Sequence, residues 1–453
     1  MTEFHLSKRK KTFRALFLLY FMVYFCTGIL PVNIDNLLIS LTGATALGIG
    51  ITVSLTLIIG TMSIFVFGYF GDKITEKYSR KRIFMYTNIL WITAYGLSSL
   101  SFNFIFYSTC LIIGAIGTGA FLPIGFSIIG DFFPPKERGN KFGTMQFGLI
   151  LGNGMGIIFG GLLGSYIGIN GWRYAYALGF ILGITTILMY IFTGIDPETG
   201  RAEPEFMDFK GKIDYDYKLT FDNLKELLKK KTIGGILLAV LCTGIAGTTL
   251  GTWGIFYLSS KLEGNDAGLI ATTIYILAGS GSLLGAIIGG KVGDSYFRSG
   301  KIKGRVLISV IGNALGPIFL MVFYLTPFFT ENPLQIIISW IFFLIIGYAG
   351  YMFSSFPVGN QFAIYSEVST PELRSTANAM NGLMVNIGGI IGNLLISSLI
   401  EKNISLLPFA LSIVLFIWLI GALFWIIPYF KYPKESKMCR EILLERRKEL
   451  EKK

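Results

Sequence analysis

The chain has very little of the side-chain chemistry on which most enzymes and metalloproteins depend. Its 453 residues include a single histidine, His5, and only four cysteines, which excludes a metal site or a catalytic triad built on histidines. The cysteines show no Cys-x-x-Cys spacing, and no Gly-x-x-x-x-Gly-Lys-Ser/Thr phosphate loop is present, which argues against ATP hydrolysis. We therefore expect no metal, no cofactor and no enzymatic activity.

Charged residues are also scarce, and the apolar residues occur in long runs. Charged residues make up 15% of the chain and hydrophobic residues 53%, with a mean hydropathy of +0.63, whereas a soluble domain carries about 25% charged residues. A helix needs roughly 20 apolar residues to cross a bilayer, and the runs hold too many glycines and too little alternation for a β-barrel. We predict an all-α membrane protein. Its twelve transmembrane helices fall near 15–39, 45–70, 83–100, 103–130, 142–168, 173–194, 233–258, 267–290, 306–327, 334–366, 375–400 and 406–430.

One pattern of charged residues occurs twice. Asp131 and Arg138 are seven residues apart, as are Glu367 and Arg374, and the two copies are offset by 236 residues (367 − 131). The same offset relates two glycine pairs in the apolar runs, Gly152 and Gly156 with Gly388 and Gly392. Such a duplication predicts two pseudo-symmetric six-helix bundles.

The two halves set the expected domain organisation. We expect an N-terminal bundle over 1–194, a cytoplasmic linker over 195–232, a C-terminal bundle over 233–430 and a cytoplasmic tail over 431–453. Within the linker, apolar residues at helical spacing from Phe221 to Leu228 precede a run of lysines. This pattern predicts a short amphipathic helix on the membrane surface, with a flexible linker as the alternative. The charged tail from Glu435 predicts a solvated helix.

Basic residues are distributed unequally between the two sides of the predicted membrane. Only Arg173, Lys261 and Lys402 fall in segments opposite the N-terminus, so 36 of the 39 Lys and Arg residues (39 − 3) share one side. By the positive-inside rule, both termini are expected in the cytoplasm of a multi-pass protein of the cell membrane. The net charge of +12 is then expected to face anionic lipid rather than nucleic acid.

The charged motifs at the inner ends of the spans resemble those of the major facilitator superfamily. Gly68-Tyr-Phe-Gly-Asp72-Lys73, followed by Arg80-Lys81-Arg82, is similar to the family's loop between spans two and three, with about four extra residues before the basic triplet. The second copy keeps Gly290 and Asp294, with Ser295 in place of the basic residue. The resemblance implies a cytoplasmic gate formed by Gly68, Gly71, Asp72, Lys73, Arg80, Lys81, Arg82, Asp131, Arg138, Gly290, Asp294, Glu367 and Arg374.

The physical interpretation of these acids has two alternatives. Asp72 is placed to face the N-terminus of the eleventh span, where Ser369-Thr370-Pro371-Glu372 has the composition of a helix start. The resemblance implies that such networks hold the two halves together on the inner side while the outer side is open. Alternatively, each acid caps only its own helix.

Three further segments resemble the Spinster group of this superfamily, which transports lysophospholipids, sphingoid lipid phosphates and related amphiphiles. Val32-Asn33-Ile34-Asp35-Asn36 is similar to the group's first-span motif, and Arg374-Ser-Thr-Ala-Asn-Ala379 matches its eleventh-span motif. The linker start, 196–203, resembles it loosely. The chain departs from the group in its fourth span, where Ile112 replaces an arginine and Thr118 occupies the position of a glutamate. This departure weakens a proton-antiport interpretation.

Asp35 is the strongest candidate for substrate binding or ion coupling, because it is the only ionisable residue well inside a span of the first half. A carboxylate in lipid costs at least roughly 3 kcal/mol, so such residues usually face a cavity. The alternative is that Asp35 lies near the outer edge and reaches water. The other substrate or coupling candidates are polar or amphipathic residues of the spans, namely Asn33, Asn36, Thr118, Asn153, Trp253, Tyr257, Tyr351, Asn360, Asn381 and Asn386; each also fits a helix–helix contact.

The sequence thus favours a secondary active or facilitative transporter that works by alternating access. Its partners are expected to be the lipid bilayer and a small-molecule or lipid-like solute, and the chain is expected to work as a monomer. Polar metabolite or drug efflux by proton antiport is the first alternative, and a membrane sensor that does not transport is the second.

Overall fold

The computed structural model describes residues 3–69, 79–133, 135–197, 229–262, 267–327, 332–369 and 371–451. Within these residues the regular structure is helical, and an isolated β-bridge pairs Thr42 with Asn103. The chain divides into two compact units, Met1–Tyr217 and Lys218–Lys453.

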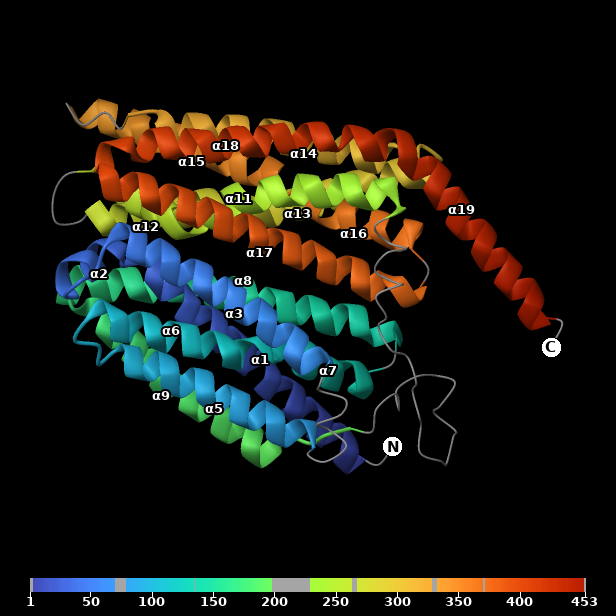
Figure 1. Cartoon of the computed structure of the whole chain (residues 1–453), viewed down its shortest axis with the longest axis horizontal. Coiled ribbons are helices and arrows are strands. Elements are labelled where there is room, and N and C mark those ends of the chain that lie inside the picture. The colour runs from blue at the N-terminus through green and yellow to red at the C-terminus, as the bar shows by residue number, and fades with distance from the viewer. Residues whose placement is uncertain are drawn as a thin grey trace. The chain divides into compact units, whose positions relative to one another are not determined.

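The first unit is a bundle of long helices (Figure 1). Its elements are α1 (Glu3–Val32), α2 (Ile34–Ser40), α3 (Ala46–Tyr69), α5 (Arg80–Ser98), α6 (Phe104–Gly119), the π-helix η1 (Phe121–Gly125), α7 (Phe126–Phe132), α8 (Pro135–Ile167) and α9 (Gly171–Thr193). Helix α1 packs along α8 and α9, and α5 packs between α6 and α9.

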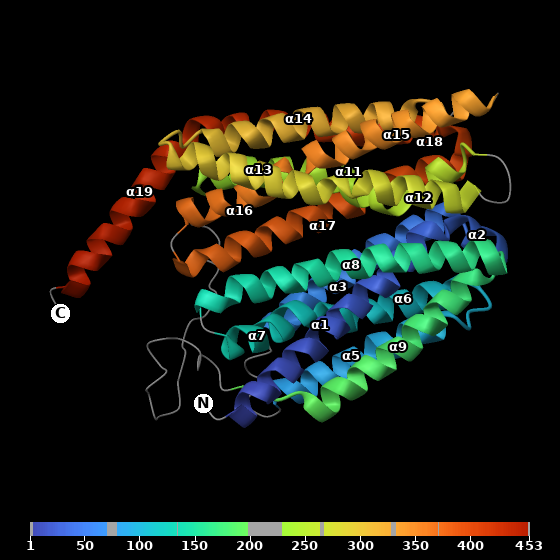
Figure 2. The same cartoon turned by 180° about the vertical axis from the view of Figure 1, so that it is seen from behind.

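The second unit has a corresponding set of helices, and its last helix runs on past the ends of the others (Figure 2). Its elements are α11 (Lys231–Ser259), α12 (Ala267–Gly279), α13 (Gly281–Arg298), α14 (Gly304–Leu325), α15 (Pro333–Ser354), α16 (Phe356–Val368), α17 (Pro371–Lys402), the 3-10 helix η3 (Ile404–Leu406), α18 (Leu407–Phe424) and α19 (Ile426–Glu451). Helix α11 packs along α17 and α18. The helix predicted for the charged tail is present as the C-terminal part of α19.

All twelve predicted spans are helical. Eleven segments of the described chain are long and apolar enough to cross a membrane. The remaining predicted run, 83–100, which is the third along the chain, is α5, whose first turn carries three basic residues, Arg80, Lys81 and Arg82. The predicted all-α membrane fold is therefore confirmed.

Several spans are built from more than one helix, and proline accompanies most of the breaks. Pro31 lies at the end of α1, Pro123 lies in the π-helix η1, and Pro357 lies in the first turn of α16. Proline lacks a backbone N–H and clashes with the preceding turn, so it bends or ends a helix. The tenth predicted span, 334–366, is likewise made of two helices, since α15 ends at Ser354 and α16 begins at Phe356.

The duplicated glycines bring the first and fifth spans of each unit into close contact. A Cβ atom at Gly152 or Gly156 of α8 would overlap the carbonyl oxygens of Phe21 and Phe25 on α1. In the second unit, Gly388 and Gly392 of α17 meet the carbonyl oxygens of Leu241 and Ile245 on α11 in the same way. Small residues at this four-residue spacing allow helix backbones to approach closely in a membrane.

In the first unit the glycine contact extends over the C-terminal half of both helices. Five glycines of α8, each four residues from the next, meet α1 or the residues just after it: Gly148, Gly152, Gly156, Gly160 and Gly164. We call this the α1–α8 glycine ladder.

The amphipathic helix predicted in the linker from Phe221 to Leu228 falls outside the described residues. The four segments predicted from the sequence, 1–194, 195–232, 233–430 and 431–453, stay predictions.

Candidate functional site

A buried arginine organises the charges at the N-terminal end of α5 in the first unit. Arg80, in the first turn of α5, donates from Nε to Asp196 at 3.0 Å and from Nη1 to Asp131 on α7, and both are ion pairs. The side chains of Arg80 and Asp131 are only 10% and 11% exposed. Because a cation at a helix N-terminus opposes the helix dipole, the two carboxylates are what stabilises Arg80 there. We call Arg80, Asp131 and Asp196 the first charge cluster.

The second unit holds an equivalent arrangement. Arg305, in the first turn of α14, donates to Glu367 on α16 and to Asp294 on α13, the latter at 2.7 Å. The hydroxyl of Tyr432 on α19 donates to the other oxygen of Glu367. The Arg305 guanidinium also lies 4.2 Å from the centre of the Phe297 ring. Arg305, Asp294, Glu367 and Tyr432 form the second charge cluster.

The duplicated acids Asp131 and Glu367 occupy corresponding places in the two clusters, but sequence reasoning missed three members. Arg305, Asp196 and Tyr432 were not among the predicted residues. Two signals were available: Arg305 opens the third apolar run of its half as Arg80 does, and Asp196 and Tyr432 are separated by 236 residues (432 − 196), the offset of the acids.

The remaining gate candidates are placed less centrally. The Lys81 ammonium donates to the carbonyl of Ile191 at 2.9 Å, and Arg82 is exposed. Gly68 lies near the end of α3, and Gly290 of α13 faces open space. Gly71, Asp72 and Lys73 lie outside the described residues, as do the side chains of Arg138 and Arg374, so the predicted contact of Asp72 with the eleventh span also lies outside them.

Asn33 stands at the break between α1 and α2. Its side-chain amide donates to the carbonyls of Ile29 at 3.0 Å and of Gly160 on α8 at 3.2 Å, and its carbonyl oxygen accepts from the Asn36 amide at 3.1 Å. Asp35 follows in the first turn of α2, where a carboxylate is favoured by the helix dipole, and it is exposed. The structure therefore brings Asn33 and Asn36 together and fixes the turn that carries Asp35.

A group of aromatic residues surrounds Tyr324 of α14 in the second unit. The hydroxyls of Tyr324 and Tyr351 lie 2.8 Å apart, and the ring centres of Tyr257 and Tyr324 lie 6.2 Å apart. Tyr275 packs edge-on against Tyr351 with ring centres 5.9 Å apart. Two predicted residues, Tyr257 and Tyr351, are thus linked through one that was not predicted.

The other predicted polar residues join helices to one another or to their own backbone. Trp253 donates to Asn393 at 3.2 Å, Asn360 donates to Gly289 at 3.0 Å, and Asn381 accepts from Tyr365 at 3.1 Å. Thr118 donates to the carbonyl of Ala115 in its own helix at 3.2 Å. Asn153 of α8 lies against Gly28 of α1, and Asn386 is a half-buried residue of α17.

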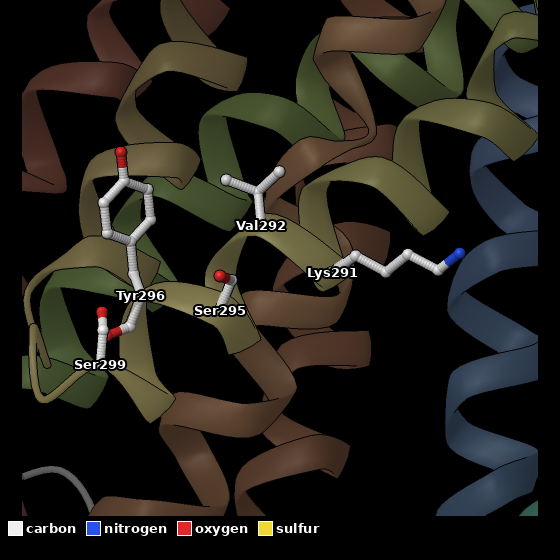
Figure 3. Close-up of a pocket in the computed structure, with 5 residues that line it drawn as sticks. All are labelled: Lys291, Val292, Ser295, Tyr296 and Ser299. Atoms are coloured by element: carbon white, nitrogen blue, oxygen red, sulfur yellow. The ribbon is translucent and has the colours of Figure 1, made fainter.

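An open hollow lies along the C-terminal part of α13 (Figure 3). It is lined by Lys291, Val292, Ser295, Tyr296 and Ser299. The Lys291 side chain extends away from Tyr296 and Ser299 rather than toward them, so the lining side chains do not converge on one point. None of the site residues predicted from the sequence lines this hollow. Within the described part of the chain, no group of three His, Cys, Asp or Glu side chains could hold a metal ion.

Comparison with known proteins identifies the family. A model of the Major Facilitator Superfamily matches residues 16–393. Protein spinster of Drosophila melanogaster is 24% identical over 231 residues, which cover 51% of this chain and 36% of that protein. Multidrug resistance protein 3 of Bacillus subtilis is 24% identical over 370 residues, which cover 71% of this chain and 67% of that protein.

The fold agrees with that of a solved transporter. The crystal structure of a bacterial homolog of the human lysosomal transporter Spinster, in an inward-facing and occupied conformation, superimposes with a TM-score of 0.71 at 17% identity. The match covers 94% of this chain and 98% of that one. Because the family model covers most of the sequence, the chain belongs to the major facilitator superfamily. The resemblance to Spinster proteins is confirmed.

Proposed function

We propose that the chain is a transmembrane transporter of the cell membrane that works by alternating access and carries an amphiphilic, lipid-like solute. Both termini are placed in the cytoplasm, and the chain works as a monomer. The solute and the bilayer are its partners.

The observation that carries this proposal is the pair of charge clusters. At the N-terminal end of its third span, each unit holds one buried arginine that pairs with two carboxylates. This arginine is Arg80 in the first unit and Arg305 in the second. Such a cluster ties several helices of one unit into a rigid body, because a buried ion pair is strongly destabilised when one partner leaves. Transporters built from two like halves work by moving one rigid half against the other.

The solute class rests on the Spinster resemblance and on the break after α1. The resemblance to the Spinster group implies a lysolipid or sphingoid solute, and the similarity to protein spinster supports that resemblance. The Asn33–Asn36 contact holds the turn that carries Asp35. In this proposal Asp35 is the residue that couples transport to protons or meets a cationic head group.

A test of the solute class is a thermal-shift screen of the purified full-length chain. Lysophospholipids, sugars, amino acids and organic cations would be compared at equal concentration. A rise in the unfolding temperature with lysophospholipids alone supports the amphiphile proposal, because a bound ligand stabilises the folded state. A rise with organic cations alone would instead favour the drug-efflux alternative, which the similarity to Multidrug resistance protein 3 supports.

Asp35→Asn tests the coupling role. In proteoliposomes we expect this variant to lose the pH dependence of uptake of a fluorescent lysophospholipid, since an amide does not titrate. Glu441→Gln, which removes an acid that is 57% exposed on α19, serves as the matched control and should keep the dependence. Unchanged pH dependence in Asp35→Asn would reject Asp35 as the coupling site. Binding of a lysophospholipid without any uptake would favour the sensor alternative.

A further inference from the structure

Three basic residues, Arg173, Lys261 and Lys402, fall in segments predicted to lie opposite the N-terminus. The first two share one structural role. Arg173 and Lys261 both contact backbone carbonyls at the C-terminal end of the third span of their own unit, α5 and α14. The N-terminal ends of the same two helices carry the arginines of the charge clusters, Arg80 and Arg305.

Arg173 caps the end of α5. Its guanidinium Nη1 donates to the carbonyls of Ser99 at 3.1 Å and Ser101 at 2.6 Å, just past the last residue of α5. It also lies 4.4 Å from the centre of the Trp172 ring, and Trp172 is fully buried. Arg173 itself is in the first turn of α9, where a cation opposes the helix dipole. The Nε of Arg173 also donates to the side-chain oxygen of Asn170 at 3.0 Å. The α5 end, the Trp172 ring and Asn170 are therefore the contacts that favour an arginine here.

Lys261 caps the end of α14 from a different element. It follows the end of α11 by two residues, and its ammonium donates to the carbonyls of Tyr324 and Thr326, the latter at 2.9 Å. The same ammonium lies 4.5 Å from the centre of the Tyr257 ring and 6.0 Å from that of Phe343 on α15. One side chain thus joins the ends of α11 and α14 and lies near the middle of α15.

The two contacts are physically alike. The last carbonyls of a helix have no partner within the helix and carry a partial negative charge, so a cation there is favourable. A ring face adds a second attraction for the same cation. The two caps come from different places in the sequence: Lys261 follows the first span of its unit, and Arg173 lies in the first turn of the sixth span of its unit. The repeat itself therefore does not account for them.

We propose that Arg173 and Lys261 are paired positioning residues that fix the C-terminal ends of α5 and α14. Each third span is then held at both ends, by a charge cluster at its N-terminus and by a cation cap at its C-terminus. This inference deepens the transport proposal by naming the residues that keep each half rigid as it moves. Its activity measurement rests on the proposed function.

The two caps differ in how readily the cation loses its proton, and this difference allows a second test. Burial lowers the pKa of Lys261 from 10.5 to about 8, because the carbonyls and rings offset only part of the cost of burying the ammonium, so this cap loses its charge at moderately alkaline pH. The groups around it in the described residues are Tyr257, Tyr324 and Phe343; the nearest acids in the sequence, Glu263 and Asp266, lie outside the described residues. An arginine in the same place would stay charged.

The test is amide hydrogen exchange on the full-length protein in lipid nanodiscs, which needs no solute. Lys261→Met is expected to speed exchange several-fold in the last turn of α14 and to leave α5 unchanged. Arg173→Met is expected to do the reverse. Lys261→Arg and Arg173→Lys should restore most of the protection, and Lys402→Met, which removes the third outer cation, should change neither helix end. Equal exchange in the wild type and both Met variants overturns the proposal.

The activity arm uses uptake of a fluorescent lysophospholipid into proteoliposomes. We expect a lower Vmax with unchanged KM in Lys261→Met and Arg173→Met, and recovery in the two conservative variants. A local increase in exchange with wild-type Vmax would overturn the positioning role. If the wild type itself carries no lysophospholipid, the proposed function fails, while the exchange experiment still decides whether the two caps exist.

Discussion

At the scale of single residues, the membrane protein must match every buried charge, and it does so around two arginines. Arg80 contacts Asp131 and Asp196, and Arg305 contacts Asp294 and Glu367. Since a buried ion left without its partner costs far more than the pair gains, these clusters are more sensitive to the loss of one member than exposed ion pairs are.

Removing either arginine should therefore destabilise its unit. We expect Arg80→Gln and Arg305→Gln each to lower the free energy of unfolding by roughly 3–5 kcal/mol, seen as a lower unfolding temperature in detergent. Lys301→Gln, which removes an exposed charge next to α14, should change it by less than about 0.5 kcal/mol. Equal effects of Arg305→Gln and Lys301→Gln would contradict the role given to the second cluster.

Lys261 predicts a pH dependence with a definite sign. Its pKa is lowered to about 8 in the folded protein, so between about pH 8 and pH 10 the unfolded chain binds more protons than the folded one. The contribution of Lys261 to stability is thus constant below about pH 8 and rises with pH above it. The unfolding temperature of the wild type relative to Lys261→Arg should increase from pH 7.5 to pH 9.5; a flat difference would reject the lowered pKa.

At the scale of helices, glycine decides which pairs are close. The α1–α8 glycine ladder and its shorter counterpart between α17 and α11 place backbone against backbone. Where no side chain intervenes, the gain comes from van der Waals contact between main chains. The ladder ends at Gly160 and Gly164, whose missing side chains leave room for the amides of Asn33 and Asn36.

Two glycines of α8 that are two residues apart, and so point in different directions, provide a matched test of the ladder. Gly156→Ala should destabilise the first unit, because its methyl group would overlap the Phe25 carbonyl. Gly154→Ala has open space around it and should be neutral or stabilising by up to about 1 kcal/mol, since alanine is the better helix former. Unfolding temperatures in the same detergent compare the two, and a similar change in both variants would mean that the close approach is absent.

Much of the element structure follows from sequence, and the exceptions have physical reasons. The twelve spans are predictable because lipid demands long apolar helices. Asp131 and Glu367 could be found because the chain repeats them. The contacts of Arg80 with Asp196, and of Glu367 with Arg305 and Tyr432, join residues 116, 62 and 65 positions apart, and helical spacing contains no information about such pairs. Most of the predicted asparagines bond backbone or neighbouring helices, which a sequence pattern does not distinguish from a solute contact.

At the scale of the whole molecule, the repeated units are the basis for proposing alternating access. Each unit carries its own charge cluster, its own glycine contact between first and fifth spans, and its own cation cap. These features make each half internally rigid without requiring the other half. A protein built in this way is suited to move as two bodies, which is how a carrier differs from a channel.

The measurement that tests this account most directly is counterflow in proteoliposomes. Vesicles that contain the full-length protein would be preloaded with unlabelled lysophospholipid and exposed to a trace of the fluorescent analogue. A carrier that exposes one site to each side in turn predicts transient accumulation of the labelled solute, which vanishes without preloading. Entry at the same rate with and without preloading, or no entry beyond that of protein-free vesicles, would contradict it.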